Sequence, residues 1–201
     1  MTPLDPGQFG AFFRELWEVE PFPWQRELAR RVVESGWPSA LDLPTASGKT
    51  AALDIAVFHL ALEADRGIER RAPVRIFFVV DRRLVADSAY ERARDIAQRL
   101  RAANDGVLKL VADRLRLLAD DATMPLRVVR LRGGMPKEPD WATSVAQPTV
   151  VVSTVDQVGS RLLFRGYGVS PSMAPVHAGL IGMDSLVLLD EAHLSRAFAQ
   201  T

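Results

Sequence analysis

A lysine and a hydroxyl side chain follow a glycine early in the chain, in the run Leu43-Pro44-Thr45-Ala46-Ser47-Gly48-Lys49-Thr50. The run joins a short β-rich segment to an almost wholly apolar helical segment, residues 51–62. Triphosphates bind at such turns, because backbone N–H groups surround the phosphate oxygens, a lysine reaches the β- and γ-phosphates and a hydroxyl binds Mg²⁺. The spacing therefore predicts these roles for Lys49 and Thr50. Leu43 stands where the G-x-x-x-x-G-K-[ST] pattern has its first glycine, so a plain helix start stays an alternative.

Two adjacent carboxylates follow an apolar segment in Asp190-Glu191-Ala192-His193. Asp190 lies 141 residues after Lys49. A carboxylate at the end of a strand can hold Mg²⁺ through water, and its neighbour can orient an attacking water. We assign Asp190 to the metal and Glu191 to the water. In isolation the tetrapeptide is also typical of a polar helix N-terminus, in which Asp190 caps the helix and Glu191 meets its dipole. Both motifs, each after a strand and in this order, favour a nucleotide-binding fold.

Five short β-rich runs alternate with helical patterns, which predicts an α/β fold with a parallel sheet. Most of these runs are apolar at consecutive positions, as strands covered on both faces are. The carboxyl ends of parallel strands share one edge, so the chemistry is expected there. The runs are residues 39–43, 74–81, 126–132, 149–154 and 185–190. Helical stripes are predicted for residues 86–100 and 108–118, and an amphipathic helix for residues 9–17. The amphipathic helix is expected to dock on the core; alternatively, it binds a partner.

Composition narrows the classes of protein. The chain has 201 residues, 48% of them hydrophobic, with 25 Lys and Arg, 25 Asp and Glu, and no cysteine. One globular domain, or one with a small appendage, fits this length. The lack of cysteine excludes disulfides, thiolate metal sites and a cysteine nucleophile, and favours an intracellular, cytoplasmic location. No run is long enough to span a membrane, no secretory leader is evident, and the zero net charge argues against a histone-like grip on nucleic acid.

The two motifs together resemble motifs I and II of superfamily 2 DEAH-type helicases. The resemblance implies an α/β fold of RecA-like type, a P-loop domain whose mainly parallel sheet is flanked by helices, with ATP and Mg²⁺ as cofactors. It implies that residues 45–50 (Thr45, Ala46, Ser47, Gly48, Lys49 and Thr50) surround the phosphates. Leu43 and Ala46 depart from the family pattern, which usually has Ala or Gly first and Gly before the serine. We expect N-terminal helices with an adenine-reading segment in residues 1–36 and the first RecA-like domain in residues 37–201.

Three further segments are similar to helicase motifs. Phe22-Pro23-Trp24-Gln25 is similar to the adenine-reading segment, which implies that Gln25 bonds the base edge beside the aromatic Phe22; alternatively, Trp24 and Leu28 lie on the core face of a helix. Asp81-Arg82-Arg83 resembles motif Ia, and Ser153-Thr154 resembles the motif whose threonine contacts the sugar-phosphate backbone.

These segments predict a nucleic-acid track. It comprises Arg82, Arg83, Thr154 and the pair Gly133 and Gly134, whose backbone N–H groups a phosphate can approach. Alternatively, Thr154 caps a helix and the two arginines are solvated surface charges. The resemblance implies that His193 couples the ATP site to a partner domain.

A narrower resemblance rests on segments 79–83, 153–157, 162–168 and 177–180, ahead of Asp-Glu-Ala-His. These segments look like the helicase-nuclease of type I CRISPR interference, subtype I-G (formerly I-U). That family implies an ATP-driven 3′-to-5′ translocase on single-stranded DNA, recruited by a Cascade-type complex to degrade the displaced strand. Its metal-dependent His-Asp nuclease domain is expected downstream, and a second RecA-like domain must supply arginine fingers, so this chain is expected to be half of a motor.

Two other classes stay open. One is a different superfamily 2 motor, such as a restriction-type translocase or an RNA helicase. The other is a nucleotide-binding adaptor without motor activity, which the departures at Leu43 and Ala46 would fit. The intact Lys49, Thr50, Asp190 and Glu191 weigh against the adaptor.

Overall fold

The computed structural model describes residues 3–44, 47–81, 83–131, 139–142, 144–195 and 198. These residues fall into two compact units. The first unit comprises residues 1–72 and 96–125, and the second comprises residues 73–95 and 126–201, so the division falls inside one long helix. The expected division at residue 36 stays a prediction.

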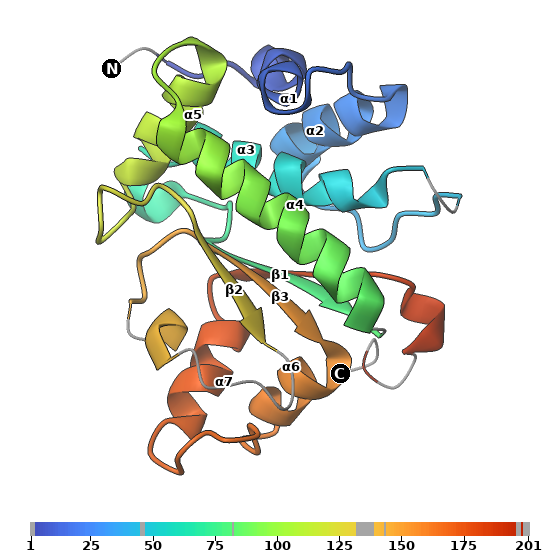
Figure 1. Cartoon of the computed structure of the whole chain (residues 1–201), viewed down its shortest axis with the longest axis vertical. Coiled ribbons are helices and arrows are strands. Elements are labelled where there is room, and N and C mark those ends of the chain that lie inside the picture. The colour runs from blue at the N-terminus through green and yellow to red at the C-terminus, as the bar shows by residue number, and fades with distance from the viewer. Residues whose placement is uncertain are drawn as a thin grey trace. The chain divides into compact units, whose positions relative to one another are not determined.

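The first unit is helical in its described part (Figure 1). Its α-helices are α1 (Phe9–Trp17), α2 (Pro23–Ser35), α3 (Ala52–Leu62) and α5 (Gly106–Arg116), with 3-10 helices η1 (Pro6–Gln8), η2 (Lys49–Ala51) and η3 (Gly67–Glu69). The last part of α4 (Arg83–Ala102) also belongs to it. Helices α1, α2, α3 and α5 pack on one another. The ring of Phe58 on α3 lies 5.4 Å from that of Phe12 and 5.6 Å from that of Phe9.

Two ionised side chains fix helix ends in this unit. Glu15 on α1 accepts hydrogen bonds from the N–H groups of Val107 (3.1 Å) and Leu108 (2.7 Å), and so caps the N-terminus of α5. Buried Arg114 on α5 donates to the carbonyl oxygens of Ala61 (2.6 Å) and Leu62 (3.0 Å), and so caps the C-terminus of α3. Such caps satisfy backbone groups that a helix leaves unpaired at each end.

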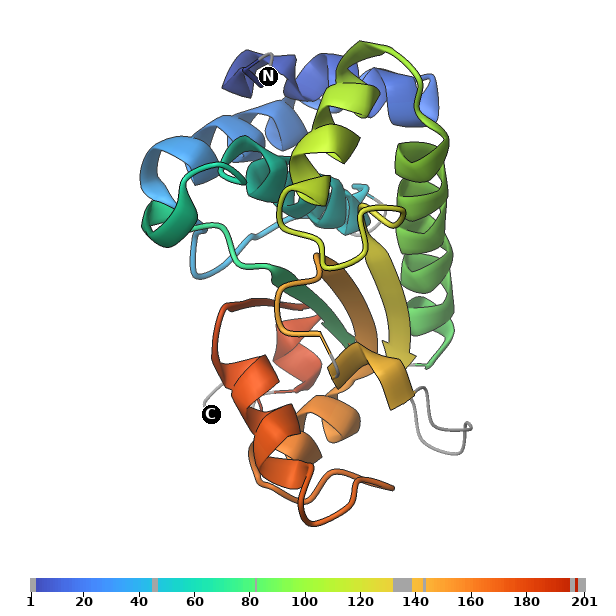
Figure 2. The ribbon, with the colours of Figure 1, turned by 90° about the vertical axis from the view of Figure 1, so that its left-hand side faces the viewer.

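The second unit is built on a four-stranded, all-parallel sheet, and Figure 2 shows strands that run in one direction. Its strands are β1 (Arg75–Val80), β2 (Arg127–Leu131), β3 (Thr149–Thr154) and β4 (Ser185–Leu189), in the spatial order β2-β3-β1-β4. The helices are the first part of α4, α6 (Val155–Leu162), α7 (Ala174–Gly182) and the 3-10 helices η4 (Pro139–Ala142) and η5 (Ala192–Leu194). The sheet as described ends at β4, where Val187 is 39% exposed.

Helices α6 and α7 pack on one face of the sheet, and the register explains which side chains they cover. Val129, Val151 and Phe77 lie side by side on neighbouring strands. They share a buried cluster with Val158 of α6 and Leu180 of α7. Because side chains alternate between the faces of a strand, the same register directs every second residue to the other face.

Two arginines also fix the second unit. Arg75, 5% exposed, donates to the carbonyl oxygens of Leu180 (2.9 Å), Met183 (2.8 Å) and Val145 (2.7 Å), which ties the C-terminus of α7 to β1. Arg130 of β2 lies 3.9 Å from the ring centroid of Tyr90 and pairs with Asp87 at 3.0 Å, which joins β2 to α4.

The structure confirms four of the five predicted strands and the parallel sheet. It also confirms the amphipathic first helix, whose Phe9, Phe12, Phe13 and Leu16 are buried. The strand expected at residues 39–43 is wrong: the segment has no regular structure, and Leu41 is 41% exposed. A strand requires a hydrogen-bonded neighbour, and the described part of the first unit contains no strand. No helix that the structure describes is long and apolar enough to cross a membrane.

Candidate functional site

The predicted phosphate-binding turn ends in a left-handed glycine. Gly48 has φ 76° and ψ 33°, a conformation that glycine adopts without the cost that a Cβ brings. Lys49 and Thr50 follow in η2, which leads directly into α3. Ser47 closes the turn, because its hydroxyl donates to the carbonyl oxygen of Pro44 over 2.7 Å. The lysine and the hydroxyl thus stand at the start of a helix, as the sequence predicts.

The first turn of α2 holds this turn from the carbonyl side. Trp24 donates its indole N–H to the carbonyl oxygen of Ser47 over 3.0 Å. The Gln25 amide nitrogen donates to the carbonyl oxygen of Gly48 over 3.4 Å. The carbonyl groups of Ser47 and Gly48 are therefore bound within the protein. Backbone N–H groups and the dipole at a helix start favour an anion, so an anion is expected on the opposite side of the turn.

The two expected adenine contacts differ in exposure. Phe22 is 54% exposed, so its ring is open to a base. Gln25 is only 2% exposed, and its amide oxygen accepts the Phe22 N–H over 2.9 Å. Both ends of the Gln25 amide are thus bound to backbone. A role of Gln25 in reading adenine stays a prediction.

In the second unit, the parallel strands bring three predicted segments to one edge of the sheet. Asp81 follows β1, Thr154 ends β3 and Asp190 follows β4. The Asp190 N–H donates to the carbonyl oxygen of Val79 over 2.9 Å. This bond extends the pairing of β4 with β1 by one residue and fixes the position of the Asp190 backbone. This edge is where parallel α/β sheets bind their ligands.

Glu191 has a strained backbone. Its φ of 50° and ψ of 48° are left-handed, which is uncommon for a residue with a side chain. Its N–H donates to the Asp190 carboxylate over 3.1 Å, and its own carboxylate lies 3.4 Å from Nδ1 of His193. Asp190, Glu191 and His193 are thus linked to one another in series.

Thr154 occupies the N-cap position of α6, with φ −91° and ψ 156°. Its side chain makes no capping hydrogen bond, so the alternative that it serves α6 as a side-chain cap is not supported. Five predicted site residues lie outside the described residues: Thr45, Ala46, Arg82, Gly133 and Gly134. Arg83 begins α4, but its side chain also lies outside the described part.

Trp24 is the contact that sequence reasoning missed, because an aromatic residue beside Leu28 is typical of a core helix face. Leu28 is indeed buried, at 4% exposure. The available signal was the indole N–H, which seeks a hydrogen-bond partner when its ring is packed.

Comparisons with known proteins assign the chain to no family. No family model, no curated protein and no solved structure matches the chain.

Each of the two predicted metal ligands, taken by itself, has a side chain suited to magnesium. Within the described residues, no group of three or more His, Asp or Glu side chains is arranged to hold a metal by itself. Magnesium in nucleotide sites is bound through one or two protein oxygens, substrate phosphates and water, so such a group is not required. The Thr50 hydroxyl and the Asp190 carboxylate are oxygen ligands of the kind that Mg²⁺ prefers.

Proposed function

We propose that this chain is the N-terminal, RecA-like ATP-binding half of an ATP-dependent translocase that moves 3′-to-5′ on single-stranded DNA. In the complete protein it would feed a nuclease in CRISPR interference. Lys49, Thr50, Asp190 and Glu191 carry its ATP chemistry.

The observation that carries the proposal is the left-handed Gly48 immediately before Lys49 and Thr50 at the start of a helix. A left-handed glycine before a lysine and a hydroxyl at a helix start is the local arrangement that triphosphate-binding turns use. The carbonyl contacts from Trp24 and Gln25 support it, because they keep the acceptor groups of the turn away from the anion.

The carboxylates at the sheet edge support hydrolysis. Mg²⁺, when bound, neutralises charge on the β- and γ-phosphates. The sequence motifs assign Thr50 and Asp190 to this metal and Lys49 to the phosphate oxygens. Glu191 would orient the attacking water and accept its proton, while His193, 3.4 Å from that carboxylate, would sense its position.

The DNA and CRISPR parts of the proposal rest on the resemblance of the sequence segments. The position of Thr154 at the same sheet edge as Asp190 supports a nucleic-acid contact there. A Cascade-type partner, a second RecA-like domain and a His-Asp nuclease domain follow from the resemblance alone.

Nucleotide binding is the first test. We expect the 201-residue chain to bind a fluorescent ATP analogue with Mg²⁺, and Lys49→Ala to weaken binding at least 10-fold. The matched control is Lys109→Ala, because Lys109 is a half-exposed lysine on α5 that pairs with Asp113 at 2.5 Å. Equal affinity in the wild type and Lys49→Ala would refute the phosphate site.

Hydrolysis is the second test. We expect the complete gene product to hydrolyse ATP faster with single-stranded DNA, and Glu191→Gln to abolish that rate. Stimulation by RNA alone would identify a different superfamily 2 motor, and full function in Lys49→Ala would identify an adaptor. Rapid multiple-turnover hydrolysis by residues 1–201 alone, abolished by Glu191→Gln, would refute the half-motor proposal.

A further inference from the structure

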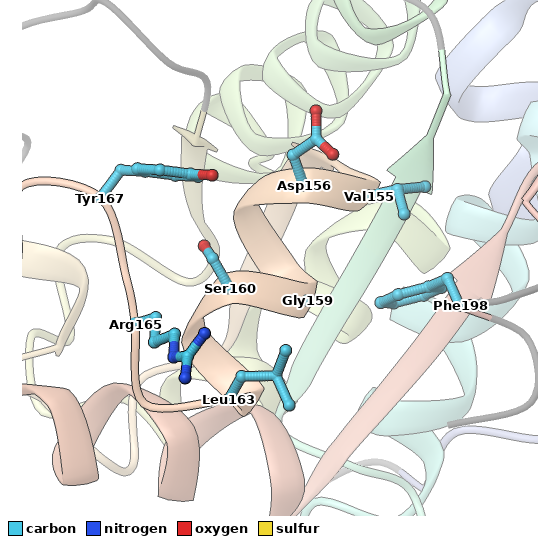
Figure 3. Close-up of a pocket in the computed structure, with 8 residues that line it drawn as sticks. All are labelled: Val155, Asp156, Gly159, Ser160, Leu163, Arg165, Tyr167 and Phe198. Atoms are coloured by element: carbon cyan, nitrogen blue, oxygen red, sulfur yellow. The ribbon is translucent and has the colours of Figure 1, made fainter.

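A groove of about 420 Å³ runs along the outer side of α6 in the second unit, a size within the range of small-ligand sites. Its lining residues are Val155, Asp156, Gly159, Ser160, Leu163, Arg165, Tyr167 and Phe198. Figure 3 shows Tyr167 and Phe198 on opposite sides of α6, with Asp156 and Arg165 toward opposite ends and Ser160 between them. Gly159 forms the floor, where a Cβ would stand 3.6 Å from the Phe198 ring.

The loop that forms one wall packs against a buried arginine that joins α6 to α7. Arg161, 6% exposed, donates to the Gln157 carbonyl oxygen (2.9 Å) and to Nδ1 of His177 (3.3 Å). The loop passes so close to it that a Cβ on Gly166 would lie 2.9 Å from Arg161 Cγ. Arg165 is also bound back to α6, since its N–H donates to the Ser160 carbonyl oxygen over 2.7 Å. The groove is therefore preformed.

The polar side chains at the groove have unused bonding capacity. Among the described residues, Arg165, Asp156 and Tyr167 make no side-chain hydrogen bond or ion pair. Tyr167 is 66% exposed, which leaves its ring face open. An exposed aromatic face, an unpaired guanidinium and an unpaired carboxylate together fit a ligand that has a ring, an anionic group and hydrogen-bond donors.

The position of the groove in the fold limits the class of ligand that it would bind. Val155 and Asp156 follow Thr154 directly, so the groove begins at the carboxyl edge of the sheet, where the nucleic-acid track is proposed. A nucleotide has the three required features, and unstacked bases bind on aromatic side chains in single-strand sites.

We propose that this groove binds one unstacked base of a single strand, and the inference rests on the proposed function. Tyr167 stacks on the base, and Arg165 binds the adjoining phosphate. The Asp156 carboxylate accepts from an amino group of the base, which favours cytosine over thymine, because thymine lacks such a group at that position.

The test measures fluorescence anisotropy of labelled 12-nucleotide dC and dT strands on the 201-residue chain, with Mg²⁺ and an ATP analogue. We expect Tyr167→Ala to weaken binding roughly 5- to 100-fold. Arg165→Ala should weaken binding and reduce the slope of log affinity against log salt by about 1. Asp156→Ala should remove the preference for dC over dT.

Phe164→Ala is the matched control, because Phe164 is 61% exposed in the same loop but does not line the groove. Its affinity should stay within about two-fold of the wild type. Equal losses in Phe164→Ala and Tyr167→Ala would overturn the groove, as would unchanged affinity in both Tyr167→Ala and Arg165→Ala. Tyr167→Ala could instead leave the DNA affinity unchanged and alter self-association, as measured by sedimentation. That result would show that the groove is a protein contact and would also overturn the proposal.

ATP-analogue binding to the same variants separates the two proposals. If the groove variants bind both the ATP analogue and DNA as tightly as the wild type does, only the groove proposal is refuted. The proposed function is then unaffected. A wild-type chain that binds the analogue but neither strand refutes the groove and the DNA part of the proposed function. A chain that binds no analogue refutes the nucleotide site itself.

Discussion

The indole N–H of Trp24 donates a hydrogen bond to the carbonyl oxygen of Ser47 over 3.0 Å. The two residues are 23 positions apart, and the bond fixes the predicted phosphate-binding turn to the first turn of α2. A turn held in its bound shape before a ligand arrives loses less conformational entropy on binding. Trp24 is therefore expected to act as a positioning residue for the proposed nucleotide site.

Trp24→Phe should weaken binding of the ATP analogue about 5-fold, the effect of losing one hydrogen bond of about 1 kcal/mol. Trp37→Phe is the control, because the Trp37 indole N–H is buried without a hydrogen-bond partner within the described residues. Isothermal titration of the two variants and the wild type measures the difference. Equal affinity in Trp24→Phe and Trp37→Phe would show that the bond has no influence on the site.

Gln25→Ala should lower the affinities for ATP and GTP by the same factor, about 3- to 10-fold. The reason is that its amide is bound to the backbone of Phe22 and Gly48 and is 2% exposed, so its removal loosens the turn whatever the base. Competition of ATP and GTP against the fluorescent analogue measures both affinities. A loss confined to ATP would instead support the adenine-reading role.

Glu63 should make the first unit sensitive to acid. Burial alone would raise the pKa of the Glu63 carboxyl, but the N–H groups of Ala72 (2.7 Å) and Arg71 (2.6 Å) lower it below its usual range. A lowered pKa means that the folded state binds fewer protons than the unfolded state. The resulting stability is present above about pH 4.5 and is lost as the pH falls through the folded-state pKa.

Glu63→Gln should therefore reduce the free energy of unfolding by about 1–3 kcal/mol at pH 7, and the difference from the wild type should shrink toward pH 3. Urea unfolding at a series of pH values measures this. Glu69→Gln, which removes an exposed carboxylate on η3, should cost less than 0.5 kcal/mol, as surface substitutions generally do. A constant difference across the pH series would contradict the assigned cause.

Arg75→Met should reduce the free energy of unfolding by about 3 kcal/mol or more. The substitution removes the donor to three carbonyl oxygens, those of Leu180, Met183 and Val145, and leaves them without that partner. Arg75→Lys should recover part of the loss, because an ammonium keeps the charge but lacks the planar fork. Chemical unfolding followed by circular dichroism tests this, and a wild-type unfolding midpoint in Arg75→Met would contradict it.

The sequence predicts the parts of this fold that depend on local pattern. β1 and β3 are apolar at consecutive positions, and this alone indicates covered strands. Residues 39–43 follow a weaker pattern interrupted by Asp42, and pairing with a distant strand is not encoded in five residues. Strand formation depends on such pairing more than on propensity.

Some residues of the candidate site could likewise be predicted from local sequence, whereas others depend on contacts between distant segments. Lys49, Thr50 and Asp190 were predicted because their spacing is local to one turn and one strand end. The contacts of Trp24 and Gln25 with the turn span 23 residues and depend on how α2 packs. The groove beside α6 also escaped prediction, because Arg165 and Tyr167 lie near a Gly-, Ser- and Pro-rich stretch that has no periodic pattern.

Among the described strands, none pairs with the outer side of β4, and this has a practical consequence for handling the protein. An edge strand presents a row of backbone donors and acceptors to any strand that comes alongside, and natural proteins often protect such edges with charge. Ser185–Leu189 carries no charged residue, and Val187 is 39% exposed. Concentrated stocks are therefore expected to precipitate by strand-to-strand association, and a lysine at position 187 is the first substitution to try for better solubility.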